Sequence, residues 1–262
     1  MTIEGVKTLP PLYGAQQNLS TSFNELSSGK KSFATTSPAM LMIGQRMLNN
    51  AQSTSVANLN VNFASSRSQT VDSYLQGSQD TMSRLKELSV QANNGILSDA
   101  DRESINTEAQ ELLKGLDQNY QSANFNGQKI LQGGTVDVAV NSAGDSIQLN
   151  SADISRETLG IENIDLSTSE GAAAALESLD GAIDLLSEQR AKVGSDLRVL
   201  DDRFASNLDY EANLRESGSK LTDLDYAFGA SEHAAGSIQS QIALAMTAQA
   251  NNLQGATIAG LF

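Results

Sequence analysis

Apolar residues at three- and four-residue steps run through the middle of the chain and predict two helices folded back on each other. Along the first helix this face holds Val71, Leu75, Met82, Leu85 and Ala92. Such a stripe suits the contact with one partner helix. Asn94-Gly95 is a typical helix end, and Ser98 with Asp101, or Asp99 with Arg102, is a typical start for the next helix. The same spacing resumes at Ile105, Ala109, Leu112 and Leu116. The stretch therefore predicts a helical hairpin.

A second, longer apolar seam lies between residues 176 and 214, where a further helix begins near Ser169. Arg190, Asn207 and Glu211 interrupt its heptad positions. The apolar members are Leu176, Leu179, Ile183, Leu186, Val193, Leu197, Leu200, Phe204 and Leu214. At roughly 1.5–3 kcal/mol per buried side chain, this face gains on the order of 15 kcal/mol before conformational entropy is subtracted. We expect it to pack on the earlier helices, in the same chain or in a neighbouring one.

The period changes to two between residues 135 and 150. Val136 and Val138 alternate with polar or small neighbours, as do Ile147 and Leu149, and a glycine-containing turn separates the two runs. This pattern predicts one small β-hairpin.

Composition favours long helices over a thick globular core. Of the 262 residues, 39% are hydrophobic and 5% aromatic, and the chain has neither Trp nor Cys. We therefore predict a mainly α fold: an elongated antiparallel helical bundle or coiled coil with one small β-hairpin region near 135–150.

Charge and hydropathy exclude two classes of partner. A formal net charge of −14 opposes binding to the phosphates of nucleic acid. No window approaches the roughly 18 apolar residues that a membrane span needs, and no signal-peptide pattern precedes the first helix. We expect neither nucleic-acid binding nor membrane insertion.

Both ends of the chain predict helices with weaker faces. The helix that follows Pro10-Pro11 carries Leu12, Leu19, Phe23 and Leu26 on one side. The last forty residues resume a helix with a weaker face of smaller residues, which holds Ile238, Ile242 and Leu253 and ends in Ile258 and Leu261-Phe262. Such faces bury little area, so we expect both termini to order when many copies pack together. We predict subunit packing by knobs-into-holes contacts, within and between subunits, of Leu12, Leu19, Phe23 and Leu26 with Ile238, Ile242 and Leu253.

Catalytic chemistry finds no support in the sequence. The single histidine, His233, has neither a second histidine nor a cysteine to share a metal, and we interpret it as solvent-facing on a helix. Carboxylate pairs such as Glu103 and Glu108 fit the solvated face of an acidic helix. We predict no enzyme activity, no catalytic or metal site and no cofactor.

Three strings in the middle of the chain resemble the most recognisable block of bacterial flagellins. They read RLKELSVQANNG, SINTEAQELLKGLDQ and FNGQKIL. The segment that ends in LSSG near the start, and the D-x-D-x-A turn at 223–227 before the last helix, also resemble that family.

The resemblance implies a structural subunit that polymerises into the flagellar filament used for motility, here a short flagellin without variable outer domains. Residues 1–40 and 220–262 would pair as the inner filament core, and 41–219 would form the outer helical domain. The implied location is extracellular, after export of the unfolded chain without a cleaved signal peptide. Implied partners are further copies in a helical homopolymer, the flagellar export apparatus and a chaperone, and hook-associated and cap proteins.

Some features depart from the family pattern and leave an alternative open. After LSSG the chain continues with Lys30-Lys31-Ser32-Phe33, where flagellins usually have a Leu-Arg-Ile-Asn type segment. The alternative is a hook–filament junction protein or a minor, non-polymerising flagellin-like adaptor. The resemblance also implies a possible contact with innate immune receptors through Arg84, Leu88 and Glu108, with an intramolecular ion pair as the other interpretation of these residues.

Overall fold

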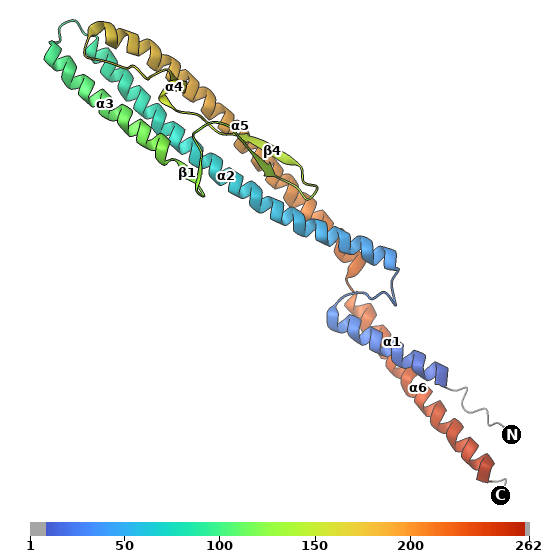
Figure 1. The fold of residues 1–262 in the computed structure, drawn as a ribbon. Coiled ribbons are helices and arrows are strands. Elements are labelled where there is room, and N and C mark those ends of the chain that lie inside the picture. The colour runs from blue at the N-terminus through green and yellow to red at the C-terminus, as the bar shows by residue number, and fades with distance from the viewer. Residues whose placement is uncertain (1–8, 260–262) are drawn as a thin grey trace. The chain divides into compact units, whose positions relative to one another are not determined.

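The protein, described here from a computed structural model, is mainly α-helical (Figure 1). The structure describes residues 9–259, with side chains from 13 to 250 and at 252. In chain order the elements are α1 (Leu9–Ser28), α2 (Pro38–Ala92), α3 (Asp99–Ser122), β1 (Asn124–Phe125), β2 (Gln128–Lys129), β3 (Thr135–Ala139), β4 (Ser146–Asn150), α4 (Arg156–Leu159), α5 (Ser169–Thr222) and α6 (Tyr226–Ala259). The predicted fold class, helical with a β-hairpin at 135–150, is confirmed.

The chain divides into two compact units. Residues 1–51 with 212–262 form the first, which we call the terminal unit, and residues 52–211 form the second, the central unit. The long helices α2 and α5 contribute to both units.

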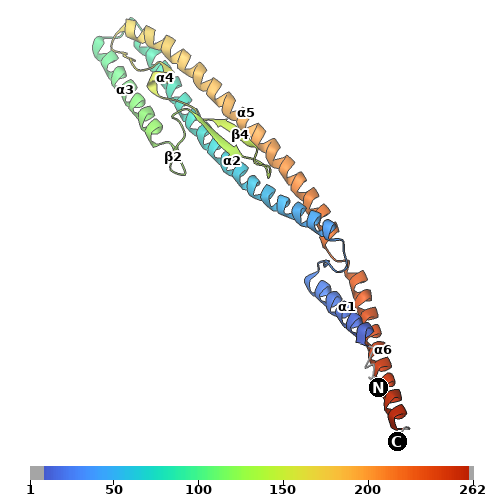
Figure 2. The same cartoon turned by 45° about the vertical axis from the view of Figure 1, so that its right-hand side comes forward.

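Three helices, α2, α3 and α5, lie side by side in the central unit (Figures 1 and 2). The five apolar residues predicted to form the face of the first hairpin helix are all buried, at no more than 1% exposure. On α3 the prediction differs by one position, because Leu113 is buried and Leu112 only half-buried. An ideal helix drifts relative to a strict heptad, so two adjacent leucines compete for one core position and their neighbours decide which enters.

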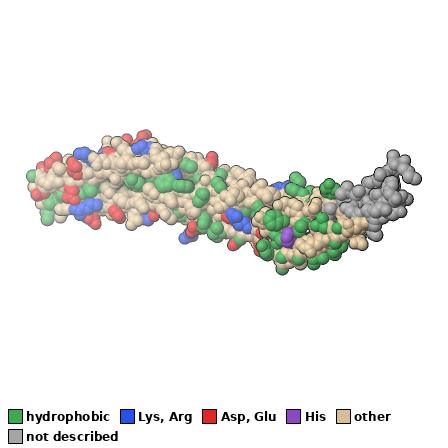
Figure 3. Space-filling view, turned by 90° about the horizontal axis from the view of Figure 1, so that it is seen from below, with side chains coloured by type: hydrophobic (Ala, Val, Ile, Leu, Met, Phe, Trp, Pro, Cys, Tyr) green, Lys and Arg blue, Asp and Glu red, His purple; other side chains and the backbone are tan. Residues whose placement is uncertain are grey.

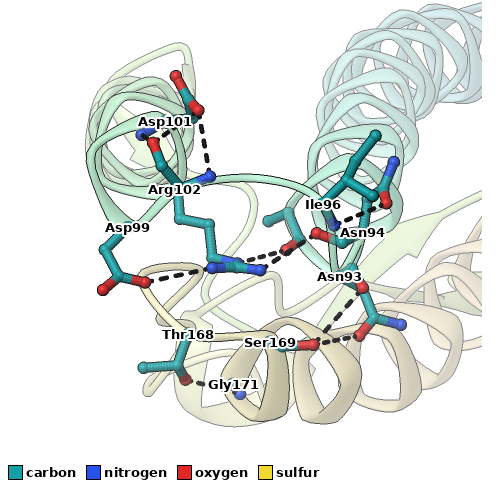
Figure 4. A network of polar contacts seen from close by, with 11 residues as sticks. Asn93, Asn94, Ile96, Asp99, Asp101, Arg102, Thr168, Ser169 and Gly171 are labelled. Atoms are coloured by element: carbon teal, nitrogen blue, oxygen red, sulfur yellow. Dashed lines mark hydrogen bonds and ion pairs between the residues drawn. The ribbon is translucent and has the colours of Figure 1, made fainter.

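The turn between α2 and α3 is held by polar contacts at both helix ends (Figure 4). Ser98 and Asp101 form the predicted capping box, in which each side chain accepts a hydrogen bond from the other residue's backbone N–H. Arg102, 8% exposed, closes the end of α2: its Nε donates to the Ala92 carbonyl at 3.0 Å and its Nη2 to that of Asn94 at 3.1 Å. These contacts fix the hairpin turn.

Two small hairpins follow α3, one more than the pattern of alternation predicted. In the predicted hairpin β3 pairs with β4, with Val138 opposite Ile147. The further one pairs β1 with β2 across Asn126-Gly127, whose φ angles are 50° and 78°. Positive φ at both turn positions is the signature of a tight Asn-Gly turn, so the FNGQ string carried this signal.

Polar residues in the α5 seam serve as links between helices. Asn207 is 7% exposed, and its Nδ2 donates to the Asn58 Oδ1 at 2.9 Å and to the Val140 carbonyl at 2.7 Å. Arg190 donates to Asp72 at 2.9 Å and to Gln79 at 3.0 Å. A buried polar residue in a coiled-coil seam fixes register, and here Asn207 joins α5, α2 and the end of β3.

Candidate assembly surface

In the terminal unit α1 lies along α6 (Figures 1 and 2). Small residues recur along both helices, and Gly236 of α6 lies against Leu19 of α1. The buried ones are Ala15 and Ser22 on α1, and Gly229, Gly236 and Ser240 on α6. Small side chains let two helices approach closely but remove little apolar area from water. Within one chain the pair is therefore held by a narrow, weakly apolar seam.

Large apolar side chains of the same unit stay exposed. Phe23 is 61% exposed, Ile238 59% and Ile242 54%. The other exposed large apolar residues of the terminal unit are Tyr13, Phe33, Met40, Met42, Ile43, Tyr226, Phe228, Leu244 and Met246. Hydrophobic side chains also gather over this unit in Figure 3. Such an extent of uncovered apolar surface is typical of a protein that binds another protein.

The seven residues predicted to pack subunits occupy different environments. Leu19 and Leu26 are half-buried, and Phe23, Ile238 and Ile242 are more than half exposed. The side chains of Leu12 and Leu253 lie outside the described residues. The packing of these residues between copies stays a prediction.

His233 is half-buried between α1 and α6, which corrects its interpretation as a solvent-facing residue. The Ser22 hydroxyl donates to the Leu19 carbonyl at 3.0 Å, so its oxygen is free to accept a hydrogen bond from the His233 Nδ1–H at 3.1 Å. The imidazole also lies against the Phe23 ring, with centroids 6.2 Å apart. Among the described residues no group of three or more His, Asp or Glu side chains is placed to hold a metal. His233 therefore acts as a polar link between the terminal helices.

The segment after α1, where the sequence departs from the flagellin pattern, is tied down by its own charged residues. Lys30 forms an ion pair with Asp223 and holds the pKa of that carboxyl below its ordinary value. The Lys31 N–H donates to the Thr222 carbonyl at 2.8 Å. Burial alone would raise the pKa of Glu25, but hydrogen bonds from Thr35 and Ser32 outweigh burial and lower it.

Two glycines permit a close crossing of α2 and α5 in the same unit. A Cβ atom at Gly218 would lie 2.8 Å from the Leu48 Cγ, and one at Gly44 would lie 2.6 Å from the Thr222 Cγ2. Both distances are shorter than real side-chain contacts, so the crossing requires glycine at each position.

The net charge divides unequally between the two units. The terminal unit holds six Lys or Arg and six Asp or Glu, so its formal net charge is zero. The central unit holds eleven Lys or Arg and twenty-five Asp or Glu, so it carries the whole formal net charge of −14. Copies that pack through their terminal units therefore meet without net repulsion there, which suits a self-associating surface.

Family models match both ends of the chain. Residues 6–135 match the bacterial flagellin N-terminal helical region, and residues 176–259 match the bacterial flagellin C-terminal helical region. The chain belongs to the bacterial flagellin family. Flagellins are structural proteins and not enzymes, which agrees with the prediction from the residues.

Related proteins match over most of their length. The flagellar filament core protein flaB2 of Brachyspira hyodysenteriae is 32% identical over 262 residues, covering 91% of each chain. The flagellar filament 30.7 kDa core protein of Treponema maltophilum is 28% identical, covering 87% of this flagellin and 86% of its own chain. The crystal structure of Bacillus cereus flagellin superposes with a TM-score of 0.53 at 26% identity, over 57% of this chain and 88% of that one.

A putative flagellar hook-associated protein from Vibrio parahaemolyticus shares the fold as well. Its TM-score is 0.56, over 69% of this chain and 95% of that one, at 13% identity. At that identity the likeness concerns the fold alone.

The residues that the family resemblance linked to receptor contact lie on the central unit. Arg84 donates to the Glu108 Oε1 from Nη2 at 2.7 Å and from Nε at 3.1 Å, and also to Glu87 at 3.0 Å. Leu88 is 2% exposed and belongs to the core between the helices. Within one chain the surface here therefore presents Arg84 and Glu108, joined in an ion pair, and not Leu88.

Proposed function

We propose that this flagellin is a structural subunit that polymerises into the bacterial flagellar filament and so serves motility. The observation that carries the proposal is the terminal unit, whose α1–α6 seam buries small residues and leaves Phe23, Ile238 and Ile242 more than half exposed. The single chain leaves most of the surface of these side chains uncovered, whereas a filament brings other copies against them.

The neutral charge of the terminal unit supports the same assignment. Many copies brought together through an acidic surface would repel one another, and the −14 charge is confined to the central unit. Relatives named flagellar filament core proteins match the chain over most of their length. We propose that residues 1–40 and 220–262 pair to form the inner core of the filament and that residues 41–219 form the outer helical domain.

Export and partners follow from this role. We propose that the chain is exported unfolded through the flagellar export apparatus, with a chaperone and without a cleaved signal peptide. Within the described part of the chain no helix is long and apolar enough to cross a membrane. At its destination outside the cell the filament would meet hook-associated and cap proteins.

Negative-stain electron microscopy of the purified chain, with and without preformed filament seeds, tests the central proposal. Long uniform filaments would support it. Particles that remain monomeric at high concentration, or that only decorate seed ends, would overturn it in favour of the junction or adaptor role.

We also propose that innate immune receptors for flagellin contact Arg84 and Glu108. Receptor-bearing reporter cells exposed to purified monomer should respond, and the paired variant Arg84→Ala/Glu108→Ala should lose most of that response. Lys114→Ala is the matched control, because Lys114 is an exposed cation on the same helix as Glu108. An equal response to the parent chain and to the paired variant would contradict this contact.

A further inference from the structure

The segment that departs from the flagellin pattern borders a pocket of about 690 Å³ in the terminal unit. Lys30, Lys31 and Phe33 line it from this segment, and Met42 and Arg46 line it from α2. Phe33 is 68% exposed and Met42 66%. Among the described residues that line the pocket there is no carboxylate. The pocket therefore combines uncovered apolar surface with positive charge.

Arg46 is the cation of this pocket that is free to bind an anion. Lys30 is paired with Asp223. The Lys31 Nζ donates to the Lys220 carbonyl at 3.1 Å. Arg46 is exposed and has neither a hydrogen bond nor an ion pair within the part of the chain that the structure describes. The other described cations of the terminal unit also have partners, namely Arg215 and Lys220.

Glu232 of α6 is the carboxylate counterpart of Arg46. It is exposed, and among the described residues it too has neither a hydrogen bond nor an ion pair. The other described carboxylates of the terminal unit each accept a hydrogen bond; they are Glu25, Glu216, Asp223 and Asp225. The described part of the unit thus leaves one cation and one carboxylate without a partner.

An aromatic side chain lies next to Glu232 on the same helix. Phe228 precedes Glu232 by four residues, so the two share one face of α6. Phe228 is 61% exposed. Its backbone is held by Asp225, whose Oδ1 accepts hydrogen bonds from the N–H groups of Ala227 at 3.0 Å and of Phe228 at 3.2 Å. A side chain on such an ordered helix end loses little conformational freedom on binding.

The spacing on α6 matches the spacing in the pocket. Met42 precedes Arg46 by four residues on α2, as Phe228 precedes Glu232 on α6. On both helices an exposed apolar side chain is therefore followed, about 6 Å further along the helix axis, by an exposed charge of opposite sign. Two helices laid side by side in the same direction can make the apolar contact and the ion pair together.

We propose that the pocket receives the start of α6 from a second copy of this chain. Phe228 of that copy packs against Phe33 and Met42, and its Glu232 pairs with Arg46. Within one chain these groups do not meet, because Phe228 stays 61% exposed and neither charge has a partner among the described residues.

The contact joins two different surfaces, so it is head-to-tail. A head-to-tail contact that does not close into a ring generates an open helical array, which is the form of a filament. This inference rests on the proposed function, since it requires that copies associate. It specifies which surfaces of the terminal units meet.

Site-directed crosslinking tests the contact directly, because the chain contains no cysteine. Gln45→Cys in the pocket and Ser231→Cys on α6 leave the contacting side chains in place. Filaments grown from an equal mixture of the two variants and treated with a short bis-maleimide should give a covalent dimer on a denaturing gel. Neither variant alone should give one.

The matched control mixes Gln45→Cys with Gln249→Cys. Gln249 is an exposed polar residue of the same helix, about 27 Å further along it than Ser231, and this pair should give no dimer.

The outcomes separate the two proposals. Filaments without the Gln45–Ser231 dimer, or with as much dimer from the control pair, would overturn this contact and leave the filament function standing. Failure of the parent chain to form filaments would overturn both. If the cysteine variants do not assemble by themselves, their copolymers with an excess of parent chain provide the same measurement.

A charge swap supplies a second, independent readout. Arg46→Glu and Glu232→Arg should each raise the critical concentration for assembly about fivefold, whereas the double variant Arg46→Glu/Glu232→Arg should return it to within about twofold of the parent value. The melting temperatures of the monomers should stay the same, because both side chains are exposed and unpaired in the described chain.

Arg198→Glu is the control for net charge, because Arg198 is exposed in the central unit, and it should leave the critical concentration within about twofold. A double variant that assembles no better than the weaker single variant would show that Arg46 and Glu232 do not meet and would overturn the inference.

Discussion

Replacing Phe23 and Ile242 by serine should weaken assembly strongly and lower the stability of the monomer much less. Both side chains are more than half exposed in the single chain, at 61% and 54%. Full burial of such a side chain is worth about 1.5–3 kcal/mol, so roughly 1–1.5 kcal/mol per residue remains to be gained on assembly. The double variant Phe23→Ser/Ile242→Ser should thus lose about 2–3 kcal/mol of association free energy. At a factor of ten per about 1.4 kcal/mol, its critical concentration should rise roughly 30- to 150-fold.

Sedimentation of filaments at increasing protein concentration measures this change. The control variant Asn24→Ser/Gln239→Ser alters exposed polar residues on the same two helices and should leave the critical concentration within about twofold. Circular dichroism on heating checks that the variant monomers still fold. A correctly folded double variant that assembles at the parent concentration would refute the argument that these exposed side chains drive polymerisation.

Three further predictions concern stability. Asn207→Ala removes hydrogen bonds of 2.9 and 2.7 Å and leaves their buried acceptors unpaired, so the free energy of unfolding measured in urea should fall by about 2–3 kcal/mol. The control variant Asn62→Ala, at an exposed position, should leave the free energy of unfolding unchanged. Gly218→Ala should destabilise the terminal unit by about 1–3 kcal/mol through steric clash, while Gly181→Ala, which meets no atom within 4 Å, should stabilise α5 by up to about 1 kcal/mol. Because the pKa of Glu25 is lower in the folded protein than its ordinary value of 4.5, its ionised carboxylate stabilises the folded state at pH values above 4.5. This stabilisation is lost as the pH falls through the lower pKa of the folded state. Between about pH 5 and pH 3 the melting temperature should therefore fall more steeply for the parent chain than for Glu25→Gln; equal slopes would contradict this.

Helices and their ends were predictable because their signals are local. Heptad spacing located α2, α3 and α5, and the Ser98–Asp101 capping box marked the start of α3 as expected. Alternation located β3 and β4. The hairpin of β1 and β2 was missed because its strands have two residues each, too few for a period, although the Asn-Gly turn announced it.

The assembly surface was predictable only in part. Sequence reasoning chose large apolar residues of the terminal helices; in the single chain Leu19 lies against Gly236, while Phe23, Ile238 and Ile242 stay more than half exposed. Ala15 and Ser22 are seven residues apart, as are Gly229 and Gly236, so a heptad of small residues was the available signal. The hydrogen bond between His233 and Ser22 could not be predicted from a local pattern, because the two residues are 211 positions apart in the sequence.

The sequence by itself determined the long helices, their caps, the larger hairpin and the family, since each depends on residues close together in the chain. Tertiary structure decided what those helices cover. Among the described residues, Leu113 rather than Leu112 enters the core, and Asn207 finds two acceptors whereas the Arg67 Nε finds none. Phe23 and Ile242 stay more than half exposed. The burial and the hydrogen-bond partners of a side chain depend on neighbours that lie far away in sequence. A helical period predicts which residues share a helix face, but it does not predict which element packs against that face.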